Sequence, residues 1–169
     1  AKIYLFQGLP KGDKMELIIQ KGTELGVKEF VPVNFERCIV KLKGKDEEKK
    51  IDRWQKIAEM AAKQSGRDLV PKITNIESIK NVCNLIQNYD IVLVAYENET
   101  NSLKKLLREN SYIKNVAIII GAEGGFQEDE VECIVSNENA MSVSLGERIL
   151  RAETASLNLL SILMYELHE

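Results

Sequence analysis

Residues 116–126 read Val-Ala-Ile-Ile-Ile-Gly-Ala-Glu-Gly-Gly-Phe, an unbroken apolar run that ends in a glycine-rich loop. An apolar run of this kind is typical of a strand that is buried on both faces of a parallel sheet. Ile91–Ala95 has the same pattern, and Met141–Ser144 is a further extended segment that leads into the charged loop Leu145–Arg151. Ligands of α/β proteins bind beyond the carboxyl ends of such strands, so these loops are the first candidates for a functional site.

Helical and extended patterns alternate along the rest of the chain. Apolar spacing, capping residues and glycine stops predict helices over residues 13–25 (with Asp13 as N-cap), 51–65, 76–87, 102–109, 128–136 and 153–167. Extended segments are predicted over residues 3–6, 30–33, 38–42, 71–74, 91–95, 116–120 and 141–144. Pro32 indicates a strand end or a sheet edge, and the charge run 43–50 indicates a solvated loop or a first helical turn. The alternation predicts one α/β domain over residues 1–169, with a mostly parallel sheet covered by helices on both faces.

The composition excludes several classes of protein. The 169 residues are 44% hydrophobic, enough for one substantial core, and the formal net charge of −3 argues against a strong autonomous grip on RNA. RNA as a substrate stays open, because basic side chains can cluster locally. We find no apolar stretch of membrane-spanning length and no signal peptide, so we expect a cytoplasmic protein without a membrane partner.

The cysteine and histidine content narrows the chemistry. Cys38, Cys83 and Cys133 are an odd number and lie far apart, which argues against a disulfide framework or a zinc knuckle and favours a reducing compartment. His168 is the single histidine, which nearly excludes Ser-His-Asp or Cys-His catalysis and a histidine-rich metal site. We therefore expect no metal.

The glycine loop Gly121–Phe126 has two interpretations. It is a structural turn, since glycines often follow a strand, or it is a ligand loop whose backbone approaches a bulky group closely. The loop lacks the GxGxxG dinucleotide fingerprint and the GK[ST] of a phosphate loop. A carboxylate such as Glu123 beside it suits a cationic or polyhydroxylated ligand better than a phosphate.

The second loop also has two interpretations. Arg148 and Arg151 are three residues apart, so in a helical turn they share a side while Ile149 and Leu150 point elsewhere. The two guanidinium groups then face an anionic or carbonyl-rich substrate, and the apolar side chains offer a wall to an aromatic ring. Alternatively, the arginines pair with Glu147 and Glu153 as a solvated salt-bridge cluster, which composition alone slightly favours.

Upstream segments carry weaker signals. Lys21–Gly26 and Gln64–Arg67 are interpreted most economically as the charged ends of helices. Arg37, Lys41 and Lys43 are candidates for an RNA-facing surface, although such charge runs are usually solvated.

Taken in order, these segments resemble the catalytic domain of the bacterial 16S ribosomal RNA uridine N3-methyltransferase family, of the SPOUT class. The resemblance covers nearly the whole chain and is carried by Lys11–Glu16, Lys21–Val27, Arg53-Trp54, Ala61–Arg67, Gly121–Phe126 and Leu145–Ala155. The glycine loop alone is a weak signal, but the ordered set is a strong one. The family pattern has proline where this chain has Ala122, which should loosen the loop without removing a reactive group.

The resemblance implies a fold and an assembly. Family members have a deep trefoil knot near the C-terminal end and dimerise through this half, which would explain the apolar last helix. The family also carries a PUA-like RNA-binding domain ahead of this region, and residues 1–169 show no such domain.

The resemblance further implies S-adenosylmethionine as the cofactor and 16S ribosomal RNA, within the small ribosomal subunit, as the substrate. The implied cofactor residues are Tyr96, Glu97, Gly121, Glu123, Gly124, Gly125, Leu145, Gly146, Ile149, Leu150 and Thr154. The implied RNA-binding residues are Lys21, Glu24, Arg37, Lys41, Gln64, Arg67 and Arg148.

The implied reaction is methyl transfer to N3 of a uridine. The neutral imide nitrogen is a poor nucleophile and no histidine is available as a base, so we expect Arg151 to stabilise negative charge on the uracil carbonyl oxygens. Glu153 orients Arg151 or assists proton removal. Two alternatives remain: a SPOUT methyltransferase acting on another RNA position, such as in tRNA, and a non-catalytic nucleotide- or RNA-binding module.

Overall fold

The computed structural model describes residues 1–97, 101–110 and 112–167, so His168 lies outside the described residues. Its centre is a parallel sheet of seven strands in the order β3-β2-β1-β6-β5-β7, with β4 also paired to β2. The strands are β1 (Lys2–Gly8), β2 (Glu29–Asn34), β3 (Lys72–Ile73), β4 (Glu77–Ser78), β5 (Ile91–Ala95), β6 (Asn115–Ile120) and β7 (Ala140–Val143). The predicted parallel α/β sheet is therefore confirmed.

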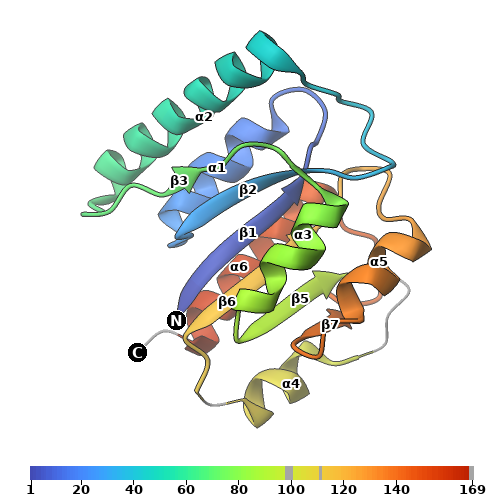
Figure 1. The fold of residues 1–169 in the computed structure, drawn as a ribbon. Helices are drawn as coiled ribbons and strands as arrows, with labels where there is room; N and C mark the ends of the chain where they lie inside the picture. Colours follow the sequence, from blue (N-terminus) through green and yellow to red (C-terminus); the bar gives the residue numbers. More distant parts are fainter. Residues whose placement is uncertain (98–100, 111, 168–169) are drawn as a thin grey trace.

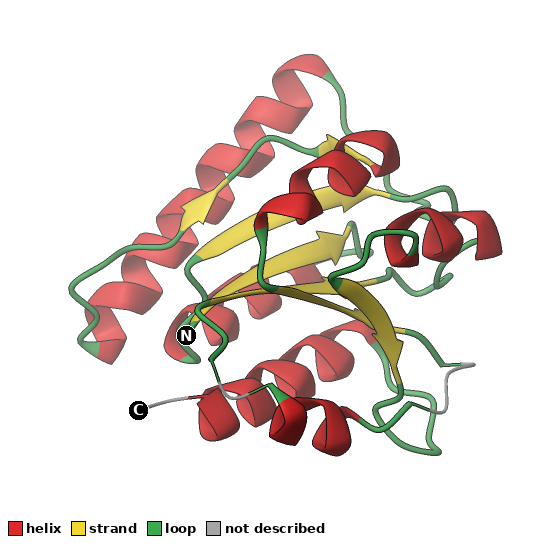
Figure 2. Ribbon diagram, turned by 60° about the horizontal axis from the view of Figure 1, so that its bottom comes forward, coloured by secondary structure: helices red, strands yellow, loops and turns green. Residues whose placement is uncertain are grey.

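Helices cover both faces of this sheet (Figures 1 and 2). They are α1 (Lys14–Glu24), α2 (Gly44–Ser65), α3 (Ile79–Leu85) with the 3₁₀ turn Ile86–Asn88, α4 (Leu103–Glu109), α5 (Glu128–Val135) and α6 (Ala152–Leu167). Helices α3 and α5 lie in front of the sheet in Figure 1, while α1 and α6 lie behind it and α2 packs against α1. Because all strands are parallel, their carboxyl ends meet at one edge of the sheet, where the loops of interest emerge.

Strand β2 differs from the sequence prediction because it lies inside the sheet rather than at an edge. It pairs with β1 on one side and with β3 and β4 on the other. Pro32 is tolerated there because the neighbouring strand is broken beside it. Ile73 of β3 pairs with Phe30, and Glu77 of β4 pairs with Val33. Residues 74–76, which connect β3 to β4, belong to no strand. The missing N–H of proline therefore removes no ladder bond on that side.

One local prediction was wrong, and two others were confirmed in part. Residues 38–42 form no strand, because the chain turns where the Cys38 N–H donates to the Phe35 carbonyl (3.1 Å) and then runs irregularly to α2. Of the two alternatives for the charge run 43–50, the helical one is confirmed and the loop is wrong, since α2 begins at Gly44 and residues 44–50 form more than its first turn. Asp13 is the N-cap residue of α1, as predicted, although its side chain makes no capping hydrogen bond.

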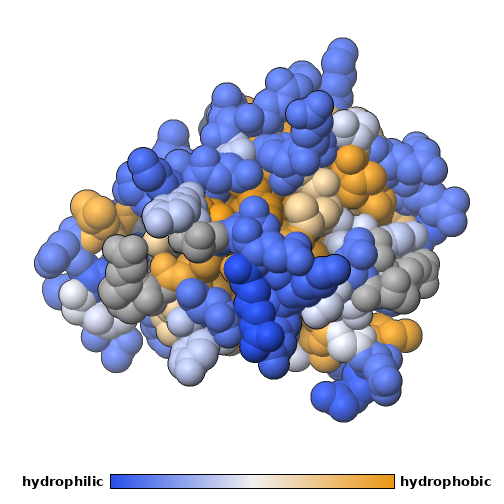
Figure 3. Space-filling model, turned by 90° about the horizontal axis from the view of Figure 1, so that it is seen from below, coloured by the Kyte–Doolittle hydropathy of each residue, from blue (hydrophilic) through white to orange (hydrophobic). Residues whose placement is uncertain are grey.

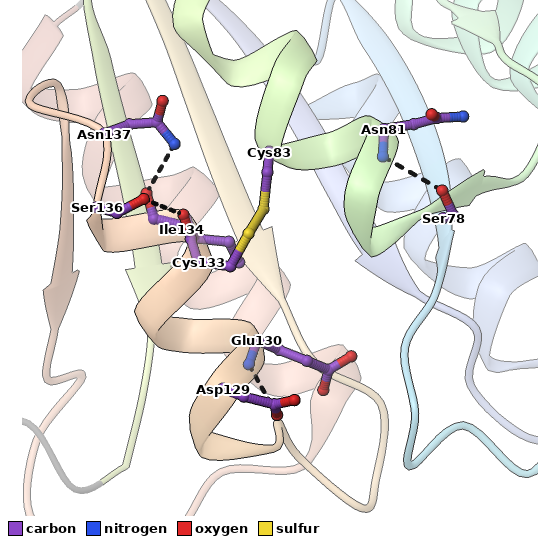
Figure 4. Close-up of a disulfide and its surroundings, with 9 residues drawn as sticks. All are labelled: Ser78, Asn81, Cys83, Asp129, Glu130, Cys133, Ile134, Ser136 and Asn137. Carbon is purple, nitrogen blue, oxygen red and sulfur yellow. Dashed lines mark hydrogen bonds between the residues drawn. A yellow bond between two sulfur atoms is a disulfide. The ribbon is translucent and has the colours of Figure 1, made fainter.

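The cysteines also differ from expectation, because Cys83 and Cys133 are joined by a disulfide (Figure 4). Helices α3 and α5 pack side by side on the same face of the sheet, which brings the two Cα atoms to 6.5 Å. The two residues are 50 positions apart, so their spacing in the sequence carries no sign of this contact. Cys38 is free and buried, and burial raises the pKa of its thiol.

The core lies on both sides of the central strands. Phe6, Leu93 and Ile118 are fully buried, and Trp54 of α2 is almost fully buried, as the apolar stripe of that helix predicts.

The face on the side of α4 and the two termini shows apolar side chains between hydrophilic ones (Figure 3). Over the described ranges, no helix is long and apolar enough to cross a membrane.

Candidate functional site

A cavity of about 490 Å³ opens at the carboxyl ends of β5 and β6. Three segments form its walls: the residues after β5, the glycine loop after β6, and the segment between β7 and α6. Its lining includes ten of the eleven predicted cofactor residues, namely Tyr96, Glu97, Gly121, Glu123, Gly124, Gly125, Leu145, Gly146, Ile149 and Leu150. The eleventh, Thr154, is exposed on the first turn of α6 and does not line the cavity.

The glycine loop is shaped by close backbone contacts. Gly125 has a φ of 70°, and the Gly125 N–H donates to the Ala122 carbonyl (2.9 Å), which closes a tight turn. A Cβ atom on Gly124 would stand 2.9 Å from the Arg37 carbonyl oxygen, so a side chain there has no room. Arg37 also donates from Nη1 to the Gly124 carbonyl (3.3 Å). Gly124 is thus needed for packing against Arg37, whatever else it contacts.

Buried side chains fix the glycine loop to the protein core. Phe126 is 4% exposed and meets Phe35 edge to face, with ring centroids 5.0 Å apart. Tyr96, in the segment after β5 that also lines the cavity, meets Phe126 edge to face with ring centroids 6.5 Å apart. The buried Glu130 of α5 accepts hydrogen bonds from the backbone N–H groups of Gln127 and Glu36. The loop is therefore fixed to the core and to the Arg37 segment at the same time.

The arginine segment is not helical, unlike the prediction. Helix α6 begins at Ala152, and residues 147–151 precede it in bends and irregular backbone. Arg148 and Arg151 nonetheless line the cavity, and so do Ile149 and Leu150, two of the predicted cofactor residues. In the described part of the chain, neither arginine forms an ion pair with Glu147 or Glu153, so the salt-bridge alternative is wrong. Both arginines are exposed.

A lysine that the sequence analysis missed lies between two of the predicted carboxylates. Lys14 Nζ is 3.1 Å from Glu123 Oε1 and 3.9 Å from Glu153 Oε2, and Lys14 also lines the cavity. The Lys11 backbone N–H donates to the same Glu123 oxygen at 2.9 Å. Burial opposes ionisation of Glu123, but the hydrogen bonds from Lys11 and Lys14 outweigh it and hold the pKa of this carboxyl below its usual range.

One local signal points to Lys14. A cation in the first turn of a helix opposes the helix dipole, which favours anions at that end. Lys14 begins α1, so its position calls for a compensating partner that the sequence alone does not identify.

The predicted RNA-binding residues fall into two groups. Arg37 and Arg148 line the cavity, and Lys41 lies close by, where its ammonium donates to Asn34 Oδ1 and the Phe35 carbonyl at the end of β2. The other group comprises Lys21, Glu24, Gln64 and Arg67, at the C-terminal ends of α1 and α2. Since both helices run antiparallel to the strands, this second group lies at the opposite edge of the sheet.

Members of the second group have partners within the protein. Lys21 Nζ pairs with Glu24 Oε1 at 3.1 Å. Arg67 Nη1 donates to the Thr23 and Val27 carbonyls at 2.8 and 3.0 Å, which satisfies the C-terminal end of α1, and burial lowers the pKa of its guanidinium. No group of three or more His, Cys, Asp or Glu side chains within the described ranges is arranged to hold a metal ion.

Comparisons with known proteins show which family this chain resembles. A family model described as "RNA methyltransferase domain" matches residues 1–164. A ribosomal RNA small subunit methyltransferase E from Bacillus subtilis is 41% identical over 170 residues, covering 98% of this chain and 66% of the relative. The crystal structure of a ribosomal RNA small subunit methyltransferase E from Neisseria gonorrhoeae, bound to S-adenosyl methionine, is 31% identical with a TM-score of 0.85 and covers 97% of this chain and 65% of that one.

A more distant structure has the same fold. The SpoU methyltransferase AviRb from Streptomyces viridochromogenes is 10% identical, with a TM-score of 0.58 over 98% of this chain and 60% of that one. The present chain spans about two thirds of the length of the Bacillus subtilis and Neisseria gonorrhoeae relatives. The family resemblance found in the sequence is thereby confirmed: the chain belongs to the RNA methyltransferase domain family.

Proposed function

We propose that these residues form the catalytic domain of an S-adenosylmethionine-dependent methyltransferase that modifies N3 of a uridine in 16S ribosomal RNA. The observation that carries the proposal is the cavity in which the glycine loop, the residues after β5 and Arg151 meet. Membership of the family supports methylation of RNA, and the names of the relatives support the small ribosomal subunit as its target.

The residues present fit the cofactor. A volume of about 490 Å³ lies within the usual range of roughly 300–1,000 Å³ for ligand pockets. Apolar side chains of Leu145, Ile149 and Leu150 offer a surface for an adenine ring, while the carboxylates of Glu97 and Glu123 suit hydroxyl and ammonium groups. When bound, the cofactor supplies a methyl group already activated on a sulfonium sulfur.

The protein's own residues then have two tasks at the uracil. Arg151 is exposed at the rim of the cavity without a carboxylate partner among the described residues, so its guanidinium is available to the uracil carbonyl oxygens. It stabilises the negative charge that develops there as N3 loses its proton. Glu153 lies two residues further on and is partly buried, so it orients this region or accepts the proton.

We place the RNA-facing surface beside the same cavity. Arg37, Lys41 and Arg148 lie there, so they are positioned to meet the phosphates on either side of the target nucleotide. The group of Lys21, Glu24, Gln64 and Arg67 lies at the opposite edge of the sheet and would need a second RNA contact.

The assembly is part of the same proposal. Helix α6 exposes Met164 (38%) and Tyr165 (84%), in keeping with a homodimer formed through this helix. We expect the protein to act in the cytoplasm on the small ribosomal subunit. The C-terminal trefoil knot and an RNA-binding domain outside residues 1–169 stay predictions.

Three measurements test the function. Calorimetry should detect binding of S-adenosylhomocysteine to the wild-type chain, and absence of binding would favour a non-catalytic RNA-binding module. Arg151→Ala should bind this ligand within about twofold of wild type yet lose at least about a hundredfold in methylation, as removal of one charge-stabilising donor does. Mass analysis of 16S ribosomal RNA from a strain without the gene should show the loss of one N3-methyluridine. Loss of a methyl group from tRNA instead would support the other SPOUT activity.

A further inference from the structure

Lys14 connects two of the three walls of the cavity. Its ammonium lies 3.1 Å from Glu123 Oε1 in the glycine loop and 3.9 Å from Glu153 Oε2 in the first turn of α6. These carboxylates come from segments that follow Lys14 in the chain by more than a hundred residues. A single cation therefore holds together the loop after β6 and the segment that carries Arg151.

This arrangement differs from an ordinary surface ion pair. The side chains of Lys14, Glu123 and Glu153 are 30%, 26% and 19% exposed, so all three are largely withdrawn from water. Glu153 Oε2 is buried and accepts no hydrogen bond from the described residues. A buried carboxylate oxygen without a donor is costly, and the Lys14 ammonium is the cation that stands beside it.

The position of Lys14 also carries a cost for α1. It begins that helix, where the N-terminal end of the helix dipole repels a positive charge. The Lys11 backbone N–H fixes the same Glu123 oxygen, so the carboxylate is held from two directions while the ammonium keeps donor capacity for Glu153. Lys14 is therefore unfavourable for α1 itself, and its contacts stabilise the arrangement of the cavity walls.

We propose that Lys14 is a positioning residue that sets the distance between the methyl-donor loop and Arg151 through Glu123 and Glu153. This inference rests on the proposed function, because it assigns the glycine loop to the donor and Arg151 to the uracil. Without the ammonium, two carboxylates that lie within 4 Å of the same nitrogen repel each other. The glycine loop and the start of α6 then move apart, and the site is no longer preorganised.

The first test replaces the charge while keeping the length of the side chain. Lys14→Met should weaken the binding of S-adenosylhomocysteine about tenfold by calorimetry, the effect of losing one charge-assisted contact in a partly exposed place. Lys14→Arg should recover most of the affinity, because it keeps the cation. Lys56→Met is the control, since Lys56 is an exposed lysine on α2 that does not line the cavity and has no part in the proposed site. The control should bind like wild type.

The second test asks whether Lys14 acts through Glu153. Glu153→Gln removes the charge that Lys14 faces, so the binding losses of Lys14→Met and Glu153→Gln should be less than additive in the double variant. Lys14→Met should also lower the methylation rate at saturating donor, because Arg151 is displaced. Equal binding by Lys14→Met and wild type, or strictly additive losses in the cycle, would overturn the proposal.

Failure of the proposed function and failure of the role of Lys14 give different results. If the wild-type chain binds no S-adenosylhomocysteine, the proposed function fails; if it binds and Lys14 has no effect, only the role of Lys14 fails. Glu123→Gln provides a test that does not depend on the folding of Lys14→Met. It should weaken binding as well, and unchanged binding in this variant counts against the proposal.

Discussion

The Ser156 hydroxyl of α6 donates a hydrogen bond to Oε1 of Gln7 in β1, and both side chains are fully buried. The contact joins the first strand of the sheet to the last helix of the described chain. The same Gln7 side chain donates from Nε2 to the Gly8 carbonyl (3.0 Å), so its amide is satisfied on both sides. The first turns of α6, which follow directly after Arg151, are thereby anchored to the strand that precedes Lys14.

Ser156→Ala should lower the free energy of unfolding by about 2 kcal/mol, because it leaves the buried Gln7 oxygen without a donor. Urea unfolding measures the change. Ser161→Ala is the control, since Ser161 lies on the same helix with an exposed hydroxyl bonded to the Leu157 carbonyl. It should change stability by less than about 0.5 kcal/mol. Equal effects of the two variants would show that the Gln7 contact adds nothing.

Much of the fold could be predicted from local patterns because these patterns have direct physical causes. Ile91–Ala95 forms a strand with the predicted bounds, since an apolar run buried on both faces has no other stable place. Gly66, with a φ of 72°, ends α2 where the sequence predicts it. Pro32 misled the prediction, because the break between β3 and β4 that accommodates it lies about 40 residues further along the chain.

The site was predicted less completely for a related reason. Glycine and arginine loops at strand ends could be identified, since parallel strands bring their carboxyl ends together. The contacts of Lys14 with Glu123 and of Cys83 with Cys133 join distant segments, and periodicity does not report which distant segments meet. Arg151 was placed in a helical turn by its spacing, yet the helix begins one residue later.

Arg67→Ala should lower the free energy of unfolding by about 2 kcal/mol, because two carbonyl groups at the end of α1 lose a charged donor. Gln64→Ala, a nearby exposed change at the end of α2, should have an effect below about 0.5 kcal/mol. Thermal or urea unfolding distinguishes the two. If Arg67→Ala weakens RNA binding while leaving the unfolding transition unchanged, Arg67 acts on RNA and its structural role is minor.

Thiol titration should find one reactive cysteine, Cys38, when the unreduced protein is unfolded, because Cys83 and Cys133 are joined (Figure 4). Reduction should then expose all three thiols. Opening a loop of this length should reduce the free energy of unfolding by about 4 kcal/mol on the chain-entropy estimate. Cys133→Ser should reproduce the effect of reduction. Three reactive thiols before reduction would contradict the disulfide.

Asp90→Asn should destabilise the protein at neutral pH but not in acid. Asp90 Oδ2 accepts the backbone N–H groups of Asn115 (2.7 Å) and Lys114 (2.9 Å), and these bonds hold the pKa of the carboxyl below its usual value. A carboxyl whose pKa is depressed by folding stabilises the folded state above the unfolded pKa of about 3.9, and this stabilisation is lost as the pH falls through the folded value.

Urea unfolding of wild type and Asp90→Asn measures this difference from about pH 2 to about pH 7, a range that spans the titration of the carboxyl. The wild type should have the higher midpoint near neutrality, and the two curves should converge in acid. Asp68→Asn, in the exposed turn after α2, is the control and should follow wild type throughout. A difference between wild type and Asp90→Asn that persisted unchanged at the acid end would mean that shape, rather than charge, ties Asp90 to the start of β6.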